Sequence, residues 1–529
     1  MIRQIARRAR RLAYQAKTHP SWCVSQLSYW RARLETDRET LGIDRRIGAV
    51  AASGPIAESY PLTVVIPLFN KETEVKRTLD SVFSQTCDPQ RFEVIVVDDC
   101  SSDSSAYLAA RYLKRFPNYR LVYLAKNSGT PSIPRNVGMK LARGEYIFLI
   151  DADDWIAPDS IETLLGVAEE SGDDYVVGRT VAIGNNPVER ITAQTESALE
   201  RRGVTLEQMD DPFCQLAPRS RIFRRSVAID NCLRFPNLRY SEDSWFFFDV
   251  LTHISTMATT TKRVCYLNRM QAKKSLSQQS SIFEKLETKL LTMQHVMESD
   301  ASEYAKRQMM IRLIEFDCIT RVYKRYSFLK RKDKSKYWPY LDRLIAIIDL
   351  YDSEHDALEP DFRHDFSREV IELGRRGEYD KIAALSHWYL EEPKEDFTIS
   401  GGRVYENTGI EGVAPLLVRL RVYADRLALG PSEAVLTLRC YGDRDEVRWL
   451  QVRSEADLDA EANFPVEYLD STNATVTIPY AQLSALPEGP CTVEMIFSAF
   501  HRAHLRTDEL EGELGRGFSV VDGHLAYRA

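Results

Sequence analysis

The sequence of 529 residues lacks any apolar run of about 18 residues, the length that a membrane-spanning helix requires. It also lacks the short apolar segment of a signal peptide, so we expect a chain that neither spans a membrane nor enters the secretory route. Its nine cysteines are scattered and form no CxxC pair. That pattern argues against a disulfide framework or a zinc site and favours a reducing compartment, which predicts a cytoplasmic protein.

The whole chain has no excess of positive charge, since its 77 acidic residues outnumber its 70 lysines and arginines. The formal net charge is −7, which argues against a general nucleic-acid binder. Residues 1–34 are the exception, since they carry eight lysines and arginines and no acidic residue. Their first part is predicted to be an amphipathic helix that contacts the anionic inner face of the cell membrane. A solvated helix or tail is an equally good interpretation.

The length favours several domains over one. Residues 1–60 are predicted to form the basic helical segment and a linker. Residues 61–280 alternate strands with helices, and the strands are almost wholly apolar: 62–70, 92–99, 119–126 and 145–150. This pattern predicts an α/β domain with a Rossmann-like, mostly parallel sheet covered by helices.

The second half of the sequence changes character twice. Residues 281–395 show helical periodicity and are predicted to be a helical linker region. Residues 396–529 contain short segments of alternating polarity separated by turns, which predicts an antiparallel β-sandwich domain.

Three carboxylates follow the last apolar strand of the α/β domain, in the segment IDADDW: Asp151, Asp153 and Asp154. Because ligands bind beyond the carboxyl ends of parallel strands, we expect these acids to lie near Phe69 and Asp99, which follow two other strands. On this pattern alone, the acids either solvate a loop or hold a cation.

Several segments of this domain are similar to one known family. PLTVVIPLFNKETE, FEVIVVDDCSSDSS, PRNVGMKLARGEYIFLIDADDW and SEDSW occur in that order. They resemble the inverting family 2 glycosyltransferases with the GT-A fold, over roughly residues 61–280. The resemblance implies a UDP-sugar donor, a divalent cation (Mn²⁺ or Mg²⁺) and a carboxylate base. The domain order resembles the wall teichoic acid (poly-ribitol-phosphate) glycosyltransferases, which implies a homo-oligomer, by analogy a trimer.

The resemblance assigns roles on the donor side. Asp153 matches the metal ligand of the family, and Asp151 matches a residue that contacts the ribose or assists the metal. Asp99 matches the acid that accepts a hydrogen bond from the pyrimidine N3–H, which favours uracil. The complete set of expected donor-binding residues is Pro67, Phe69, Asp99, Arg135, Asn136, Asp151, Arg269 and Ser277. For Arg135, bracing of the acidic loop is an alternative role.

The resemblance also places the catalytic groups. Asp243 matches the base that deprotonates the acceptor hydroxyl, and Glu242 orients it or binds acceptor. Alternatively, Ser241 or Asp243 caps the helix that follows. A basic segment suits either a phosphate-bearing acceptor or a solvated turn; its members are Arg219, Arg221, Arg224 and Arg225.

The predicted activity is metal-dependent, inverting transfer of a hexosyl or N-acetylhexosaminyl group to a hydroxyl. The expected acceptor is a glycan or polyol phosphate, that is, a bacterial cell-surface polymer or its precursor. One alternative is a non-catalytic nucleotide-sugar-binding or scaffold protein that retains the fold. Another is a nucleotidyltransferase, but such an enzyme would need a glycine-rich phosphate loop after its first strand, and PLFNKETE is not one.

Overall fold

The computed structural model describes residues 46–53, 57–183, 199–209, 211–269, 276–391, 396–455, 457, 460–497, 501–507 and 510–529. The predicted basic helix of residues 1–34 lies outside these ranges. The described residues of 46–181, 196–362 and 370–382 form one compact unit, and the remaining ones form a second. No helix among the described residues is both long and apolar enough to cross a bilayer.

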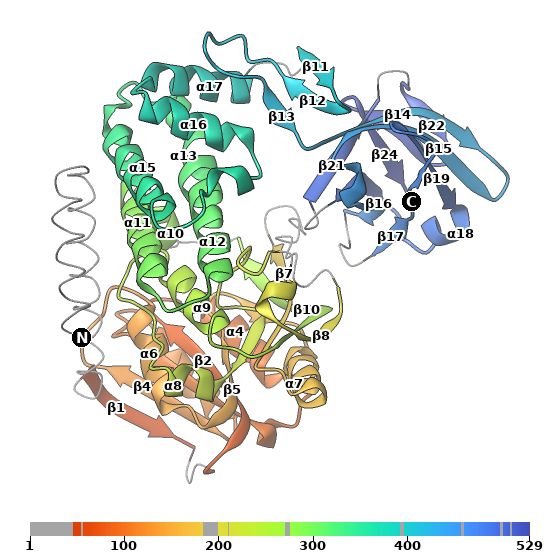
Figure 1. Cartoon of the computed structure of the whole chain (residues 1–529). Helices are drawn as coiled ribbons and strands as arrows, with labels where there is room; N and C mark the ends of the chain where they lie inside the picture. Colours follow the sequence, from red (N-terminus) through yellow and green to blue (C-terminus); the bar gives the residue numbers. More distant parts are fainter. Residues whose placement is uncertain are drawn as a thin grey trace. The chain divides into compact units, whose positions relative to one another are not determined.

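Four parallel strands lie at the centre of the first unit (Figure 1). They are β2 (Tyr60–Leu68), β3 (Phe92–Asp98), β4 (Tyr119–Leu124) and β5 (Gly144–Leu149), in the order β4-β3-β2-β5. Nearly every residue of β2, β3 and β5 is buried, as expected of a sheet covered on both faces. The predicted α/β fold with a mostly parallel core is therefore confirmed.

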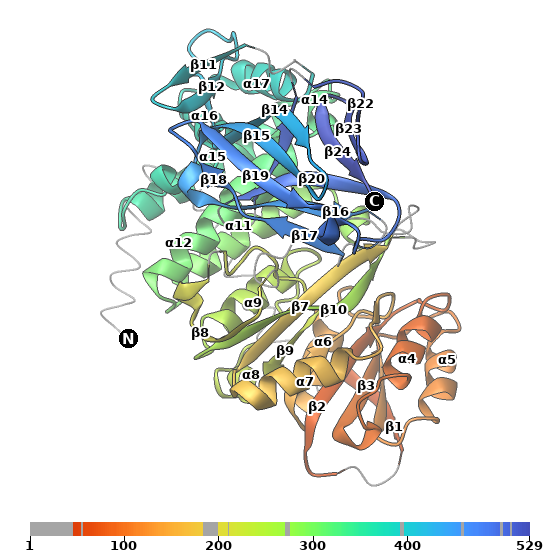
Figure 2. The same ribbon diagram turned by 90° about the vertical axis from the view of Figure 1, so that its right-hand side faces the viewer.

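Antiparallel strands extend this sheet on both sides. β1 (Ile47–Ala52) pairs with β4, within the segment that was predicted to be a linker. On the other side β9 (Arg221–Arg224) pairs with β5 and with β7 (Tyr175–Ile183) (Figure 2). The sheet is completed by β10 (Met257–Asn268), β6 (Trp155–Ile156) and β8 (Arg201–Val204). β9 has only two apolar residues between arginines, too short a pattern to predict a strand.

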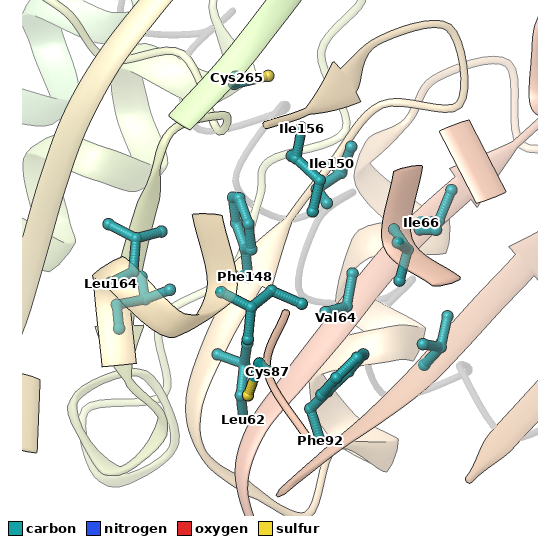
Figure 3. Packing of buried hydrophobic residues seen from close by; sticks show 14 of the residues in the cluster. Leu62, Val64, Ile66, Cys87, Phe92, Phe148, Ile150, Ile156, Leu164 and Cys265 are labelled. Atoms are coloured by element: carbon teal, nitrogen blue, oxygen red, sulfur yellow. The ribbon is translucent and has the colours of Figure 1, made fainter. Parts of the chain in front are cut away.

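Residues of alternate parity face opposite sides of the parallel strands. Leu62, Val64 and Ile66 of β2 share one buried cluster with Phe92 of β3 and Phe148 of β5 (Figure 3). The same cluster contains apolar residues of three helices: α4 (Val75–Phe83), α5 (Ser105–Leu113) and α7 (Ser160–Ser171). The opposite face of β2 packs against α6.

Helix α6 (Ser132–Leu141) approaches β2 closely because it carries a glycine at the contact. An added Cβ at Gly138 would lie 2.2 Å from Cγ1 of the buried Val65. This close approach sets the position of the N-terminal half of α6 over the carboxyl ends of the strands.

The helices between residues 242 and 352 belong to the first unit, whereas α16 and α17 each have residues in both units. Helix α9 (Glu242–Leu251) packs against α11 (Ile282–Glu298) through Trp245 and Leu291. Helix α12 (Glu303–Arg312) continues directly into η4 (Leu313–Thr320), an eight-residue π-helix. Further helices are α8 (Arg225–Asp230), α10 (Leu276–Gln279), α13 (Arg321–Tyr323), α14 (Tyr326–Leu329), α15 (Trp338–Asp352), α16 (Asp365–Arg375) and α17 (Tyr379–Glu391).

The second unit is rich in β-strands. A small sheet contains β11 (Phe397–Ser400), β12 (Arg403–Glu406) and β13 (Leu416–Val418). The larger sheet is antiparallel except for the pair of β14 (Leu420–Leu429) with β21 (His501–Arg506). Its other strands are β15 (Glu433–Gly442), β16 (Val447–Ser454), β17 (Glu461–Phe464), β18 (Glu467–Tyr468), β19 (Asn473–Pro479), β20 (Pro490–Phe497), β22 (Glu513–Gly515), β23 (Phe518–Val521) and β24 (His524–Arg528). An antiparallel β-rich C-terminal region, as predicted, is thus confirmed.

Replacing either of two helical glycines by alanine should change the free energy of unfolding, in opposite directions. Gly138→Ala should lower the free energy of unfolding by about 1–3 kcal/mol, since the new methyl group clashes with the stiff Val65 side chain. Gly166→Ala, in α7, should raise it by about 0.5–1 kcal/mol, because nothing lies within 4 Å of its added Cβ and alanine favours the helix. Urea denaturation measures both. Equal stabilisation by the two alanines would contradict the close packing of α6 on β2.

Candidate functional site

Polar and aromatic side chains meet where the parallel strands end. Phe69 follows β2, Asp99 follows β3 and Asp151 comes two residues after β5. Because these strands are parallel neighbours, their carboxyl ends share one edge of the sheet, as the sequence predicts. Pro67 is buried within β2, whereas the ring of Phe69 is 43% exposed. An exposed aromatic ring at this edge can stack on a planar ligand.

Asp99 is a buried carboxylate held by the loop that follows β4. Its Oδ1 accepts a hydrogen bond from the Ser128 amide at 2.9 Å, and its Oδ2 accepts from Ser128 Oγ at 2.8 Å and Asn127 Nδ2 at 3.0 Å. Burial raises the pKa of Asp99 to about 6, although these hydrogen bonds oppose the shift. The carboxylate is thus held in a fixed orientation in a poorly solvated place.

Two neighbouring acids have structural roles. Asp98 Oδ2 accepts a hydrogen bond from the Ser101 amide at 3.2 Å, and burial raises its pKa. Asp154 is 1% exposed; its Oδ1 accepts from the Asn268 amide at 2.9 Å and its Oδ2 lies 3.6 Å from Arg219 Nη1. Burial raises the pKa of Asp154 to about 7. These contacts tie the acidic loop to β10, so Asp154 has a structural role.

Asp151 and Asp153 each pair with a different cation. Asp151 Oδ1 accepts a hydrogen bond from Arg135 Nη2 at 2.7 Å. Burial alone would raise the pKa of Asp151, but the charges of Arg135, Arg219 and Lys71 outweigh it and lower that pKa. Asp153 Oδ2 lies 2.5 Å from Lys71 Nζ, yet burial raises its pKa. The ionised form of Asp153 therefore carries a desolvation penalty, which a divalent cation would offset more fully than Lys71 does.

Lys71 is a residue that the sequence analysis missed. It lies in the turn after β2, and its side chain reaches across 82 positions of sequence to Asp153. Its position two residues after Phe69 could have indicated a place at the edge of the sheet. A lysine there, however, is also typical of the polar start of an amphipathic helix.

The two candidate catalytic acids begin helix α9. Glu242 Oε1 accepts a hydrogen bond from Arg135 Nη1 at 3.0 Å, and its side chain is 12% exposed. Burial and the charge of Asp243 raise the pKa of Glu242 to about 7, against the opposing charge of Arg135. Asp243 Oδ1 accepts a hydrogen bond from the Ser244 amide at 2.7 Å, so Asp243 also caps its own helix.

Arg135 joins the two halves of the site. Its guanidinium is 4% exposed and contacts Asp151 on one side and Glu242 on the other. This contact matches the bracing role considered for Arg135. Asn136 faces elsewhere: its amide exchanges two hydrogen bonds of 2.9 Å with the backbone of Phe235. Its predicted part in donor binding stays a prediction, and in this structure it fixes the loop before α9.

The other predicted cations vary in their surroundings. Arg221 is buried and its Nη1 donates to the Gln215 carbonyl at 3.0 Å, while Arg219 is half-buried beside Asp154, so neither belongs to a fully solvated turn. Arg224 pairs with Asp174 at 2.8 Å. Arg269 is exposed just after β10, while the side chain of Ser277 lies outside the described residues. The roles of Arg269 and Ser277 in donor binding stay predictions.

A sheet of this topology, with an aromatic residue after its first parallel strand and acids after its second and fourth, defines a GT-A-type fold. Residues 63–230 match the model of the family "Glycosyl transferase family 2". A poly(ribitol-phosphate) beta-glucosyltransferase of Bacillus spizizenii is 29% identical over 186 residues, which are 35% of this chain and 28% of that protein. The match thus spans less than a third of that relative.

Solved structures share the fold beyond the matched family domain. The crystal structure of S. aureus TarS has a TM-score of 0.56 and 19% identity, and the match covers 88% of this chain and 84% of TarS. TarS 1-349 in complex with UDP-GlcNAc has a TM-score of 0.55 and 23% identity, covering 67% of this chain and 98% of that one. At this identity the likeness concerns the fold.

Removing Arg135 should expose its structural role. Arg135→Met leaves Asp151 and Glu242 without their shared cation, and we expect a loss of about 3 kcal/mol in the free energy of unfolding. Arg91→Met, which breaks a pair of exposed side chains with Glu169, should change it by less than about 1 kcal/mol. Urea denaturation at pH 7 measures both variants. A loss at Arg135 no larger than at Arg91 would refute the bridging role.

Proposed function

We propose that this protein transfers a sugar from a UDP-sugar to a hydroxyl of a polyol-phosphate polymer, with inversion at the anomeric carbon. The observation that carries the proposal is the pair of contacts of Arg135. One guanidinium joins Asp151, on the expected donor side, to Glu242, beside the expected base. A donor-binding edge and a candidate base are thereby parts of one site.

The donor side suits a uridine nucleotide. The fixed Asp99 carboxylate accepts a hydrogen bond from N3–H of uracil, whereas N3 of cytosine carries no hydrogen. The exposed ring of Phe69 supplies a stacking surface. TarS 1-349, which shares this fold, has been crystallised with UDP-GlcNAc, and this supports a UDP-sugar as donor.

The acidic pair fits a divalent cation that is shared with a diphosphate. Among the described residues, no three His, Cys, Asp or Glu side chains gather as metal ligands. Mg²⁺ in such sites takes one or two carboxylates and completes its shell with phosphate oxygens and water, so Asp153 and Asp151 suffice. A bound divalent cation supplies positive charge to the diphosphate leaving group. Lys71 would give up its contact with Asp153 to the cation or turn toward the phosphates.

Asp243 performs the proton transfer in this proposal. It takes the proton of the acceptor hydroxyl while that oxygen attacks the anomeric carbon from the face opposite the diphosphate. The bond to the diphosphate oxygen breaks as the new glycosidic bond forms, which inverts the configuration. Glu242 stays paired with Arg135 and holds the start of α9 in place.

Exposed cations near α9 support a phosphate-bearing acceptor. Arg239 and Arg321 expose 49% and 38% of their side chains. Arg239 precedes Tyr240 in the chain and lies 3.4 Å from Glu284, and Arg321 donates a hydrogen bond to the hydroxyl of Tyr240, three residues before Asp243. The Bacillus relative is a poly(ribitol-phosphate) glucosyltransferase, so an acceptor of this class is the one we propose.

A donor screen tests the proposed function. The protein should release free UDP from at least one UDP-sugar when Mn²⁺ or Mg²⁺ and a poly(ribitol phosphate) acceptor are present, and release should stop when the metal is chelated. CDP-sugars serve as the control because N3 of cytosine carries no hydrogen to donate to Asp99. Absence of both UDP release and UDP binding would refute the proposal and favour a scaffold role.

The candidate base can be separated from donor binding. Asp243→Asn should leave the Kd for UDP within about twofold, while the transfer rate falls by about 10² or more, as expected for loss of a general base. Calorimetric titration gives the affinity and UDP release gives the rate. If Asp243→Asn turned over at the wild-type rate, Glu242 would become the candidate base.

A further inference from the structure

We propose that helix α11 and the π-helix η4 position the catalytic base, with Lys289 and Thr292 as the positioning residues. The inference rests on the proposed function, since it concerns the same site. It assigns a role to a segment that the sequence presents only as a helical linker.

The turn before α9 has an unusual backbone. Ser241 has φ +69°, in the left-handed region that a residue with a side chain rarely adopts, and it is 3% exposed. Such a conformation costs about 1–3 kcal/mol and persists only where surrounding contacts enforce it. Because Asp243 comes two residues later, the direction of this turn fixes the backbone position from which the Asp243 side chain extends.

Thr292 of α11 provides one of the enforcing contacts. Its Oγ1 lies 3.1 Å from Ser241 Oγ. Thr292 donates its own hydroxyl proton to the Thr288 carbonyl at 2.9 Å, so Ser241 is the donor in the contact between the two hydroxyls. The N-terminal end of the turn is thus attached to α11.

Lys289, almost one helical turn earlier on α11, holds the other end of the same turn. Its Nζ donates to Ser244 Oγ at 3.0 Å, and the Ser244 amide in turn donates to Asp243 Oδ1. Its side chain is 5% exposed. Burial lowers the pKa of Lys289, and the charges of Asp317 and Asp243 oppose that shift. The two contacts therefore clamp residues 241–244 from one helix.

The π-helix η4 supplies the counter-ion of this lysine. Asp317 Oδ2 lies 3.1 Å from Lys289 Nζ and 2.6 Å from Arg312 Nη1, and Oδ1 lies 3.2 Å from Arg321 Nη1. Burial would raise the pKa of Asp317, but these three cations outweigh it and lower the pKa to about 2. π-Helical turns are rare in proteins as a whole, and those that occur often lie at functional sites.

The charge arrangement separates positioning from stability. If Lys289 is replaced by an apolar residue, Asp317 still has two arginine partners, so no acid is left alone in the interior. The start of α9, by contrast, loses the cation that holds Ser244. A change at position 289 should therefore affect the base more than the fold.

The test compares Lys289→Met with Lys306→Met, whose lysine lies on α12 and pairs with Glu303. With UDP-sugar saturating, Lys289→Met should lower kcat by about 10-fold or more and leave the Kd for UDP within about twofold, because misplaced catalytic groups act on the chemical step. The Lys306→Met variant should match wild type. In hydrogen-exchange mass spectrometry, peptides over 241–248 should exchange faster in Lys289→Met alone.

A double-mutant cycle identifies the path of the effect. Ser244→Ala removes the hydroxyl that Lys289 contacts but keeps the amide that binds Asp243. If Lys289 acts through Ser244, the double variant should lose little more activity than the single variants. Full additivity would overturn the proposed path.

The remaining outcomes also decide the proposal. Unchanged kcat together with unchanged exchange over 241–248 in Lys289→Met would overturn it. If that variant does not fold, Thr292→Val takes its place with the same expected results, since it removes the contact to Ser241 together with the bond to the Thr288 carbonyl within α11. If wild type releases no UDP with any donor, the proposed function fails, and the exchange measurement alone then decides whether α11 orders residues 241–244.

Discussion

The site depends on one buried guanidinium. Arg135 lies at the start of α6 and neutralises acids from two elements that are otherwise independent: Asp151 after β5 and Glu242 at the start of α9. Without it, these two carboxylates would repel each other near the end of the parallel strands. Because Arg135 neutralises them, the two acids can be buried without destabilising the folded chain.

The positions of the acids at the carboxyl ends of the parallel strands were predictable because their signals are local. An apolar strand followed by an acid reveals both the burial of the strand and the edge at which the acid lies, so Asp99 and Asp151 needed no knowledge of distant residues. The parallel direction of β2, β3, β4 and β5 is also predictable, because helices connect successive strands. The likeness to a known family then supplied roles that spacing alone could not.

The rest of the site was hidden because it is built from distant pairs. Arg135 and Glu242 are separated by 107 positions, and Lys289 and Ser244 by 45. In the sequence, Lys289 and Asp317 read as ordinary charges of helices, since nothing local distinguishes a buried lysine from a solvated one. Asn136 shows the same limit, because its amide is used by the Phe235 backbone rather than being free toward the strand edge. The family match, residues 63–230, also ends before Asp243.

The glycine at the centre of α6 has a consequence for the charges of the site. Gly138 lies one helical turn after Arg135, on the part of α6 that touches β2. The depth at which the helix rests on the sheet therefore sets how far the guanidinium reaches toward Asp151. Gly138, which has no side chain, thus influences the distance between the Arg135 guanidinium and the Asp151 carboxylate. Selection for activity would then restrict position 138 more tightly than packing alone.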